Sequence, residues 1–412
     1  MKKVILVITL IMTLSLVFAG VVVIKRDNSK LREGPGSWYP VLTSIPQDSK
    51  LETVEYSPEE DDFGQWLKVK YQAYQGFISQ TSTKDMPPKK NVFSQMARQS
   101  TSVTANKHSV SAGAKGFGQR FSKTFNGNSN FVVQAMNYNI NPKEYQRFKK
   151  ATYKGFSLRR NLKRVKLPKK AGQEYFSDQE TGLGLGIASV IAELGLLQDK
   201  NLQDYVNYVG LQLVEAFQLT DIEFKFFILN IPNPNAYATP GGVIFITKGM
   251  LNICSNEAEL AVILAHEITH VAYNHGMKET GERKNHITAD DRFGELDSEI
   301  DMFSEETQAV EAELENEAFT IYETLNEGRL DQYEKEADEV GMIIAARTGY
   351  DAKVMLNMLD KISKYSTKSN NQHYRKDIVS QRKKWAREFI SKASFPDNLF
   401  LKDERFKSIV KN

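Results

Sequence analysis

The sequence predicts an α+β protein of several domains, with a small all-β barrel followed by a mainly helical domain that contains a short β-sheet. Three observations predict this arrangement. Short runs of β-forming residues, separated by turn signals, fill residues 21–85. Residues 86–180 are rich in Lys, Arg, Ser and Gly and show little periodicity, which is typical of a connector. From residue 181 to 412, apolar residues recur mostly at helical spacing.

The first twenty residues, MKKVILVITLIMTLSLVFAG, have the layout of a secretory signal peptide. Two lysines precede an apolar run, and the small residues Ala19 and Gly20 offer a cleavage site. The apolar run continues through VVVI to Ile24, so an uncleaved membrane anchor is the alternative. We therefore expect export to the periplasm or cell envelope, with membrane association through the N-terminus if the segment is retained.

Residues 21–85 contain five expected β segments: VVVIKR, LREGPGSWYPVLTSI, KLETVEYS, QWLKVKY and YQGFISQT. Strands of this length and spacing predict a small barrel. Their order resembles the bacterial SH3-like domain, which implies a cell-wall or peptide ligand. Trp38, Tyr39 and Trp66 are candidates for a ligand groove, and the alternative is that these rings belong to the core.

Charge is unevenly distributed along a chain whose formal net charge is only +3. Between residues 86 and 170 the only acid is Glu144, and we expect short amphipathic helices around VVQAMNY and PKEYQRFKK. This basic connector is either a solvated surface or a contact for anionic membrane or cell-wall polymer, and we expect no nucleic-acid partner. The acidic insert at 290–328 is interpreted as a solvated face or a lid.

The region from residue 181 onwards alternates helical and β patterns. GLGIASVIAELGLL and LQDYVNYVGLQLVEAFQL predict two amphipathic helices, followed by the β-like runs IEFKFFIL and GGVIFIT. EAELAVILAHEITHVAYNHG predicts one long buried helix, because it is apolar on most faces. DQYEKEADEVGMIIAARTGYD predicts a further helix that ends at Gly349.

Three of the six histidines fall within ten positions of the predicted long helix. His266 and His270 are four residues apart, so a helix places both imidazoles on one face, as two ligands of one zinc ion. Glu267 follows the first histidine and is suited to act as the general base for water that attacks a carbonyl. Cys254 is the only cysteine, so a thiolate-rich zinc site is excluded and a metal would need His and carboxylate ligands.

The third zinc ligand is expected at a distance along the sequence. His275 lies five residues beyond His270 and, on a continuous helix, points well around it. Glu334 in YEKEADEVG is the candidate, with Asp338 on the same face as a hydrogen-bond partner for a ligand histidine. Glu336 competes, but it lies about 200° around the helix from Glu334, away from Asp338.

Three ordered blocks resemble a family of zinc metalloproteases that includes the CAAX prenyl protease, HtpX and BepA. The blocks are NAYATPGGVIFITKGML, NEAELAVILAHEITHVAYNHG and EKEADEVGMIIAARTGYD. The resemblance covers residues 181–385 and implies a mainly helical gluzincin fold with one zinc ion on His266, His270 and Glu334. It also implies that GGVIFIT is an edge strand at the active site, where a substrate backbone could pair. The strand could equally be part of the sheet core, and the two interpretations are compatible.

The resemblance has two limits. Family members often carry a His-Pro pair followed by Arg, whereas this chain has QHYRKDIVSQRKKW. His373 is therefore a candidate gate over the zinc, and Arg382 a candidate for stabilising the oxyanion. No apolar run after residue 26 is long enough to span a bilayer, so the multi-span architectures of the family are not expected.

Together these observations predict an exported zinc endopeptidase that hydrolyses peptide bonds in unfolded or misassembled envelope proteins. Two alternatives remain open. The barrel's resemblance to wall-binding domains is compatible with hydrolysis of peptidoglycan cross-links. The chain could also be a zinc-containing chaperone or adaptor with latent protease activity.

Overall fold

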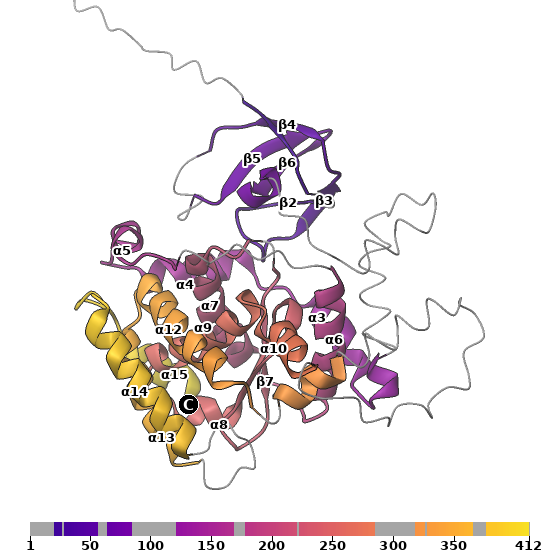
Figure 1. Ribbon diagram of the computed structural model, residues 1–412. Helices are drawn as coiled ribbons and strands as arrows, with labels where there is room; N and C mark the ends of the chain where they lie inside the picture. Colours follow the sequence, from indigo (N-terminus) through magenta and orange to yellow (C-terminus); the bar gives the residue numbers. More distant parts are fainter. Residues whose placement is uncertain are drawn as a thin grey trace, which may run out of the picture. The chain divides into compact units, whose positions relative to one another are not determined.

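The computed structural model divides into two compact units, and each is described by itself (Figure 1). The first comprises residues up to 87 except 36–39, and the second comprises residues 36–39 and 88–412. The predicted signal peptide or anchor at residues 1–19 and the candidate gate His373 lie outside the described residues. The structure describes residues 20–26, 29–56, 64–84, 121–168, 178–220, 222–284, 318–325, 328–365 and 376–411.

The first unit is built on a six-stranded antiparallel sheet with the strand order β1-β4-β5-β6-β2-β3. One more strand forms than the five expected, because the turn-rich EGPGSWYP divides the second segment into β2 and β3. Its buried core consists of Ile24, Leu31, Ile45, Leu51, Val69 and Ile78. The elements are β1 (Val21–Val23), β2 (Ser29–Arg32), β3 (Val41–Ile45), β4 (Lys50–Thr53), β5 (Trp66–Tyr71), β6 (Tyr74–Ser79) and the 3₁₀ turn η1 (Gln80–Thr83).

Of the aromatic residues considered for a ligand groove, Trp66 is only 5% exposed. Its side chain therefore behaves as part of the interior of the unit, which favours the core alternative for this residue. The SH3-like identity of the unit and its ligand remain predictions.

The second unit contains a three-stranded sheet of β7 (Lys225–Leu229), β9 (Val243–Thr247) and β8 (Ala236–Ala238), in that order. Strand β9 pairs in parallel with β7 and antiparallel with β8, and all five of its residues are buried. The expectation that GGVIFIT is an edge strand is therefore wrong. A continuous apolar run suits a strand that is covered on both faces, so β9 is central and β8 lies at the edge among the described strands.

Part of the expected connector folds into the second unit. The two expected helices form as α3 (Ser129–Asn137) and α4 (Pro142–Thr152), and a third, α5 (Leu158–Arg164), follows them. Buried side chains on all three helices hold them in place, among them Phe131, Tyr145 and Leu158. This packing was not predicted, because the many Lys and Arg made the segment resemble a polar connector. Nearly all of them lie on the exposed faces of the helices.

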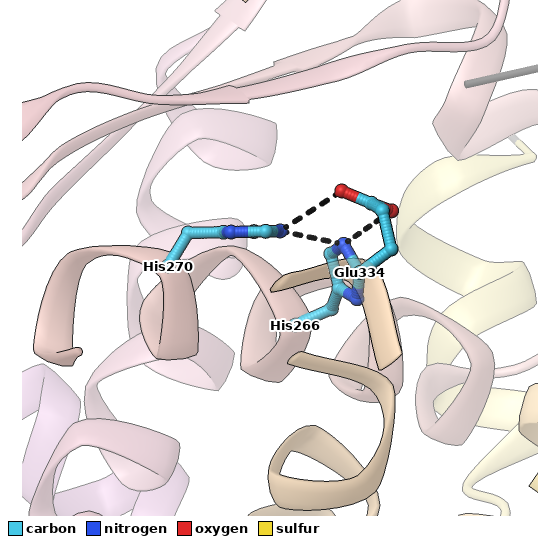
Figure 2. Close-up of side chains that lie close together, drawn as sticks. All are labelled: His266, His270 and Glu334. Carbon is cyan, nitrogen blue, oxygen red and sulfur yellow. Dashed lines mark hydrogen bonds and ion pairs between the residues drawn. The ribbon is translucent and has the colours of Figure 1, made fainter. Parts of the chain in front are cut away.

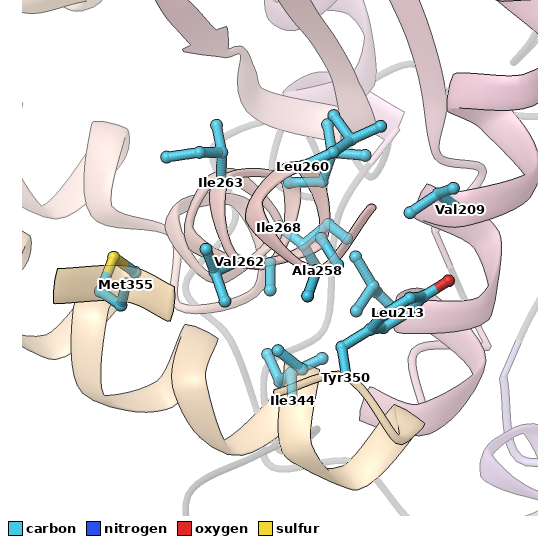
Figure 3. Close-up of a cluster of buried hydrophobic side chains, with 14 of the residues drawn as sticks. Val209, Leu213, Ala258, Leu260, Val262, Ile263, Ile268, Ile344, Tyr350 and Met355 are labelled. Carbon is cyan, nitrogen blue, oxygen red and sulfur yellow. The ribbon is translucent and has the colours of Figure 1, made fainter. Parts of the chain in front are cut away.

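Helix α9 (Glu257–Ala272) runs through the centre of the largest core cluster. Figure 3 shows its apolar side chains, such as Ile263 and Ile268, among residues of the surrounding helices. Around it lie α7 (Lys200–Phe217), α12 (Asp331–Thr348) and α13 (Met355–Ser363). The remaining elements are α6 (Asp178–Ala192), η2 (Pro240–Gly242), α8 (Lys248–Ile253), α10 (His275–Lys284), η3 (Ala352–Val354), α14 (Lys376–Lys392) and α15 (Asp403–Val410).

Two helix ends bear on the site. Helix α12 is followed by Gly349 with φ 108°, which confirms the predicted end at this glycine. Helix α9 ends at Ala272, and Asn274 adopts a left-handed φ of 56° before α10 begins at His275. The prediction of one helix through residue 276 is therefore wrong. In the described part of the chain, no helix combines the length and apolar character needed to cross a membrane.

Candidate metal centre

His266 and His270 lie one turn apart on the buried C-terminal half of α9, with exposed fractions of 6% and 3%. The helix is fixed at its start by Asn256, whose side chain accepts a hydrogen bond from the backbone N–H of Glu259. The i, i+4 spacing directs both rings to one side, and their Nε2 atoms are 3.0 Å apart. The Nε2 atoms of the two imidazoles therefore face the same point.

Helix α12 brings two buried carboxylates to the same point, Glu334 and Asp338. The helices approach closely at Gly341, where an added Cβ would lie 3.0 Å from the backbone nitrogen of His266. A larger residue at Gly341 would therefore push α12 away from the histidines. As predicted, Glu334 and Asp338 share a face, whereas the Glu336 carboxylate lies elsewhere, 3.2 Å from His275.

The atoms facing each other fit a small tetrahedral metal ion (Figure 2). The Oε2 atom of Glu334 is 3.6 Å from Nε2 of His266, and its Oε1 atom is 3.4 Å from Nε2 of His270. Two ligands of a tetrahedral ion with bonds of about 2.1 Å are separated by about 3.4 Å, close to these two distances and to the 3.0 Å between the two Nε2 atoms. Two imidazoles and a carboxylate are also the ligand types that zinc uses at hydrolytic sites.

Asp338 and Arg382 form the ionic support behind His266. Asp338 Oδ1 lies 2.9 Å from Nδ1 of His266, so Nε2 is the ring nitrogen that faces Glu334. Arg382 on α14 donates from Nε and Nη2 to Asp338 at 2.8 and 2.7 Å, and its Nη1 lies 2.8 Å from Glu334 Oε2. One guanidinium therefore holds both carboxylates.

The pKa values of this group follow from its burial and its ion pairs. Burial lowers the pKa of His266, but the hydrogen bond to Asp338 and the charges of Glu334 and Asp338 outweigh it, so the net pKa is raised. Burial raises the pKa of Asp338, but Arg382 and His266 outweigh it, so the net pKa is lowered. Asp338 is therefore held as a carboxylate that can support the ligand histidine.

His270 has a different environment. Burial, followed by the charge of Arg329, lowers the pKa of His270 well below its usual value. Its Nδ1 atom lies 2.9 Å from Nδ1 of His275, which is wholly buried. The left-handed turn at Asn274 brings His275 back to this ring, whereas a continuous helix would have carried it away.

Glu267 lies on the same turn of α9 as His266 and is half-buried. Burial raises the pKa of Tyr237 on β8, and the charge of Glu267 makes a smaller contribution in the same direction. Helix α9 packs against β8. The helix that carries the candidate base therefore lies beside the edge strand among the described strands.

The site contains most of the residues that the sequence suggested. His266, His270, Glu334, Asp338 and Arg382 come together, with Arg382 on the two carboxylates. Two neighbours of the site, His275 and Tyr237, were not predicted from the sequence. His275 was discounted on the assumption of a continuous helix, and the pair Tyr273-Asn274 was the signal for a turn. Tyr237 had no signal, because only the fold brings β8 to α9.

Comparisons with known proteins point to one family for this region. The model of the family described as peptidase family M48 matches residues 200–392, which include both histidines, Glu334 and Arg382. The chain is 30% identical over 200 residues to the beta-barrel assembly-enhancing protease of Yersinia pestis, covering 48% of this chain and 40% of the relative. The corresponding protein of Escherichia coli K12 is 31% identical over 181 residues, 42% of this chain and 36% of the relative.

A shorter region is similar to a mitochondrial enzyme. The chain is 34% identical over 71 residues to the mitochondrial metalloendopeptidase OMA1 of Schizosaccharomyces pombe, covering 17% of this chain and 21% of the relative. The matched region spans 40% or less of the length of each of these three relatives. The chain therefore corresponds to only part of each relative.

Proposed function

We propose that residues 200–392, which match the model of peptidase family M48, are the catalytic domain of an exported zinc endopeptidase that cleaves unfolded or misassembled proteins of the cell envelope. The observation that carries the proposal is the buried convergence of His266, His270 and Glu334, with Glu267 on the adjacent position of the same helix. The beta-barrel assembly-enhancing proteases named above support the choice of envelope proteins as substrates.

His266, His270 and Glu334 would hold the zinc ion, which lowers the pKa of water and polarises a carbonyl when bound. Asp338 orients the imidazole of His266, and Arg382 fixes Asp338 and Glu334. Glu267 accepts the proton of the attacking water and then donates it to the amine that leaves. The predicted role of Arg382 at the oxyanion stays a prediction, and its bonds to both carboxylates support the positioning role.

The substrate backbone would pair with the edge of β8, the strand that packs against α9, the helix of Glu267. Pairing through main-chain hydrogen bonds requires an extended segment but no particular side-chain sequence. Folded proteins seldom expose such a segment, so an edge-strand site favours unfolded or misassembled chains. The gate role of His373, an SH3-like ligand and membrane association through the N-terminus remain predictions outside this argument.

The test uses the purified full chain, with zinc measured per molecule and casein as an unfolded substrate. Glu267→Gln should retain one zinc per chain and lower kcat by at least about 100-fold, because general-base catalysis contributes about 10²–10⁴. Glu339→Gln is the matched control on α12, with the same change of charge at a half-exposed position. Undiminished casein cleavage by Glu267→Gln would exclude Glu267 as the base.

Wild type and Glu267→Gln also distinguish the peptidase from the two alternatives, a peptidoglycan cross-link hydrolase and a chaperone or adaptor. Release of muropeptides from isolated peptidoglycan without cleavage of casein would favour a cross-link hydrolase. Binding of unfolded clients by wild type and Glu267→Gln alike, without cleavage by either, would favour a chaperone or adaptor.

A further inference from the structure

His275 is the first residue of α10, yet its imidazole is part of the interior around the metal centre. Its side chain is 0% exposed. The chain reverses at Asn274, where φ is 56°, and this places the His275 ring 5.0 Å from the His270 ring, with the two planes at 76°. The contact joins the two Nδ1 atoms at 2.9 Å, which is a hydrogen-bond distance.

The other ring nitrogen of His275 faces a carboxylate. Nε2 lies 3.2 Å from Oε2 of Glu336, whose side chain is 40% exposed. The rings of Tyr333 and Tyr273 pack on the imidazole at centroid distances of 4.6 and 5.9 Å. Both nitrogens of His275 are therefore engaged, and its ring is fixed by neighbours on each side.

The protonation pattern follows from the direction of each contact. If Nε2 of His270 is to bind a metal, its lone pair must be free, and the ring proton must be on Nδ1. That N–H needs an acceptor, and the neighbouring Nδ1 of His275 can accept only if His275 is neutral with its proton on Nε2. With its proton on Nε2, His275 can donate a hydrogen bond from Nε2–H to the carboxylate of Glu336.

We propose that His275 is a positioning residue of the metal centre, accepting a hydrogen bond from Nδ1–H of His270 and donating one from Nε2–H to Glu336. The inference rests on the proposed function, because it assigns to His270 the role of a zinc ligand. The two ligand histidines are then supported in different ways. His266 is held directly by the carboxylate of Asp338, whereas His270 is held by the carboxylate of Glu336 through a neutral imidazole.

The experiment measures the zinc dissociation constant of the full chain by competition with a chromophoric chelator. His275→Leu removes the acceptor and keeps an apolar side chain in the interior, whereas His275→Gln offers a carbonyl oxygen that can accept from His270. We expect His275→Leu to weaken zinc binding by about 10- to 100-fold, the usual effect of removing a partner of a ligand histidine. His275→Gln should recover most of that loss.

Thermal melting of the metal-free proteins separates this role from packing alone. A residue that only fills the core would lower the melting temperature in both variants without a difference in zinc affinity between Leu and Gln. Equal zinc affinities of wild type and His275→Leu, or equal losses in Leu and Gln, would overturn the inference. Glu267→Gln, which should bind zinc like wild type, tests the proposed function separately, and a wild type without zinc would overturn both.

A second measurement needs no variant at His275. Long-range proton–nitrogen NMR spectra of the zinc-loaded wild type, with six histidines to assign, report the tautomer of each ring. We expect protonation on Nδ1 of His270 and on Nε2 of His275. A proton on Nδ1 of His275 would exclude it as the acceptor.

Discussion

Each end of α9 buries charged side chains, but the atoms that surround them differ in kind. At the N-terminal end, Glu257 is fully buried and accepts hydrogen bonds from Tyr205 at 2.7 Å, from Tyr350 at 2.6 Å and from the guanidinium of Arg405. At the C-terminal end, two imidazole nitrogens and a carboxylate face one another. Both groups pair a carboxylate with an Arg, but only the second also brings three potential metal-ligand atoms to one point.

This difference separates a structural site from a functional one. Donors around Glu257 compensate the cost of burying its charge, so the group is complete with protein atoms alone. The two Nε2 atoms and the Glu334 carboxylate lie this close only if a proton or a cation lies between their lone pairs. Burial and ion pairing are common to both ends, and only the convergence of ligand atoms distinguishes the metal centre.

The largest effect that tests this comparison is expected for Glu334→Ala. Loss of the third ligand should weaken zinc binding by more than about 100-fold, since loss of a supporting partner alone costs about 10- to 100-fold. Casein cleavage should disappear. Zinc per chain after dialysis measures the effect, and Glu339→Ala on the same helix is the control. Unchanged zinc content would show that the convergence is not the metal site.

The opposite end is tested by Arg405→Leu. This change leaves Glu257 buried without its cation, and we expect a loss of about 3 kcal/mol in the free energy of unfolding. The lower end of the range for broken buried pairs applies because the Arg405 side chain is 21% exposed. Urea denaturation of the metal-free protein measures it. Adding Glu257→Gln should restore part of the stability, and zinc affinity of the folded protein should not change.

A fall in zinc affinity as large as that of Glu334→Ala would contradict the separation of the two ends. The control is Lys407→Leu, which removes an exposed cation from the same helix, α15. It should leave both unfolding and zinc binding close to wild type.

The ligand set could be predicted because its members are spaced four residues apart on two helices. His266 and His270 share a helical turn, and Glu334 and Asp338 repeat that spacing on α12, so each pair needed only a correct helix. The meeting of the two pairs depends on packing at Gly341, which no periodicity reveals. The order of the three blocks in the family resemblance supplied that information instead.

The errors arose where a local pattern was extended across a turn or an edge. The apolar pattern ends at Tyr273, but the predicted helix was extended through Asn274, so the reversal that brings His275 to His270 was missed. The strand at 243–247 looked like an edge by resemblance, but its uninterrupted apolar residues are those of a central strand. Position within a sheet depends on pairing between distant segments, which one sequence does not contain.

Arg382→Lys tests the support behind His266. The guanidinium reaches both Asp338 and Glu334, and an ammonium group cannot bind two carboxylates with the same fork geometry. We expect zinc affinity to fall by about 10- to 100-fold while the metal-free fold persists. Arg387→Lys, an exposed position on α14, is the matched control. Wild-type affinity in Arg382→Lys would mean that positive charge alone is sufficient there.

The smallest expected change in stability and zinc affinity concerns the turn at Asn274, which follows the C-terminal end of α9. Asn274 adopts φ 56°, a conformation that glycine takes without strain and that costs other L-residues about 1–2 kcal/mol. Asn274→Gly should therefore be close to wild type in urea denaturation, and Asn274→Ala should lose about 1 kcal/mol. Because the turn carries His275, zinc affinity should fall more in Ala than in Gly. Equal behaviour of the two variants would show that the left-handed turn does not hold His275 against His270, and that packing by Tyr333 and Tyr273 is sufficient.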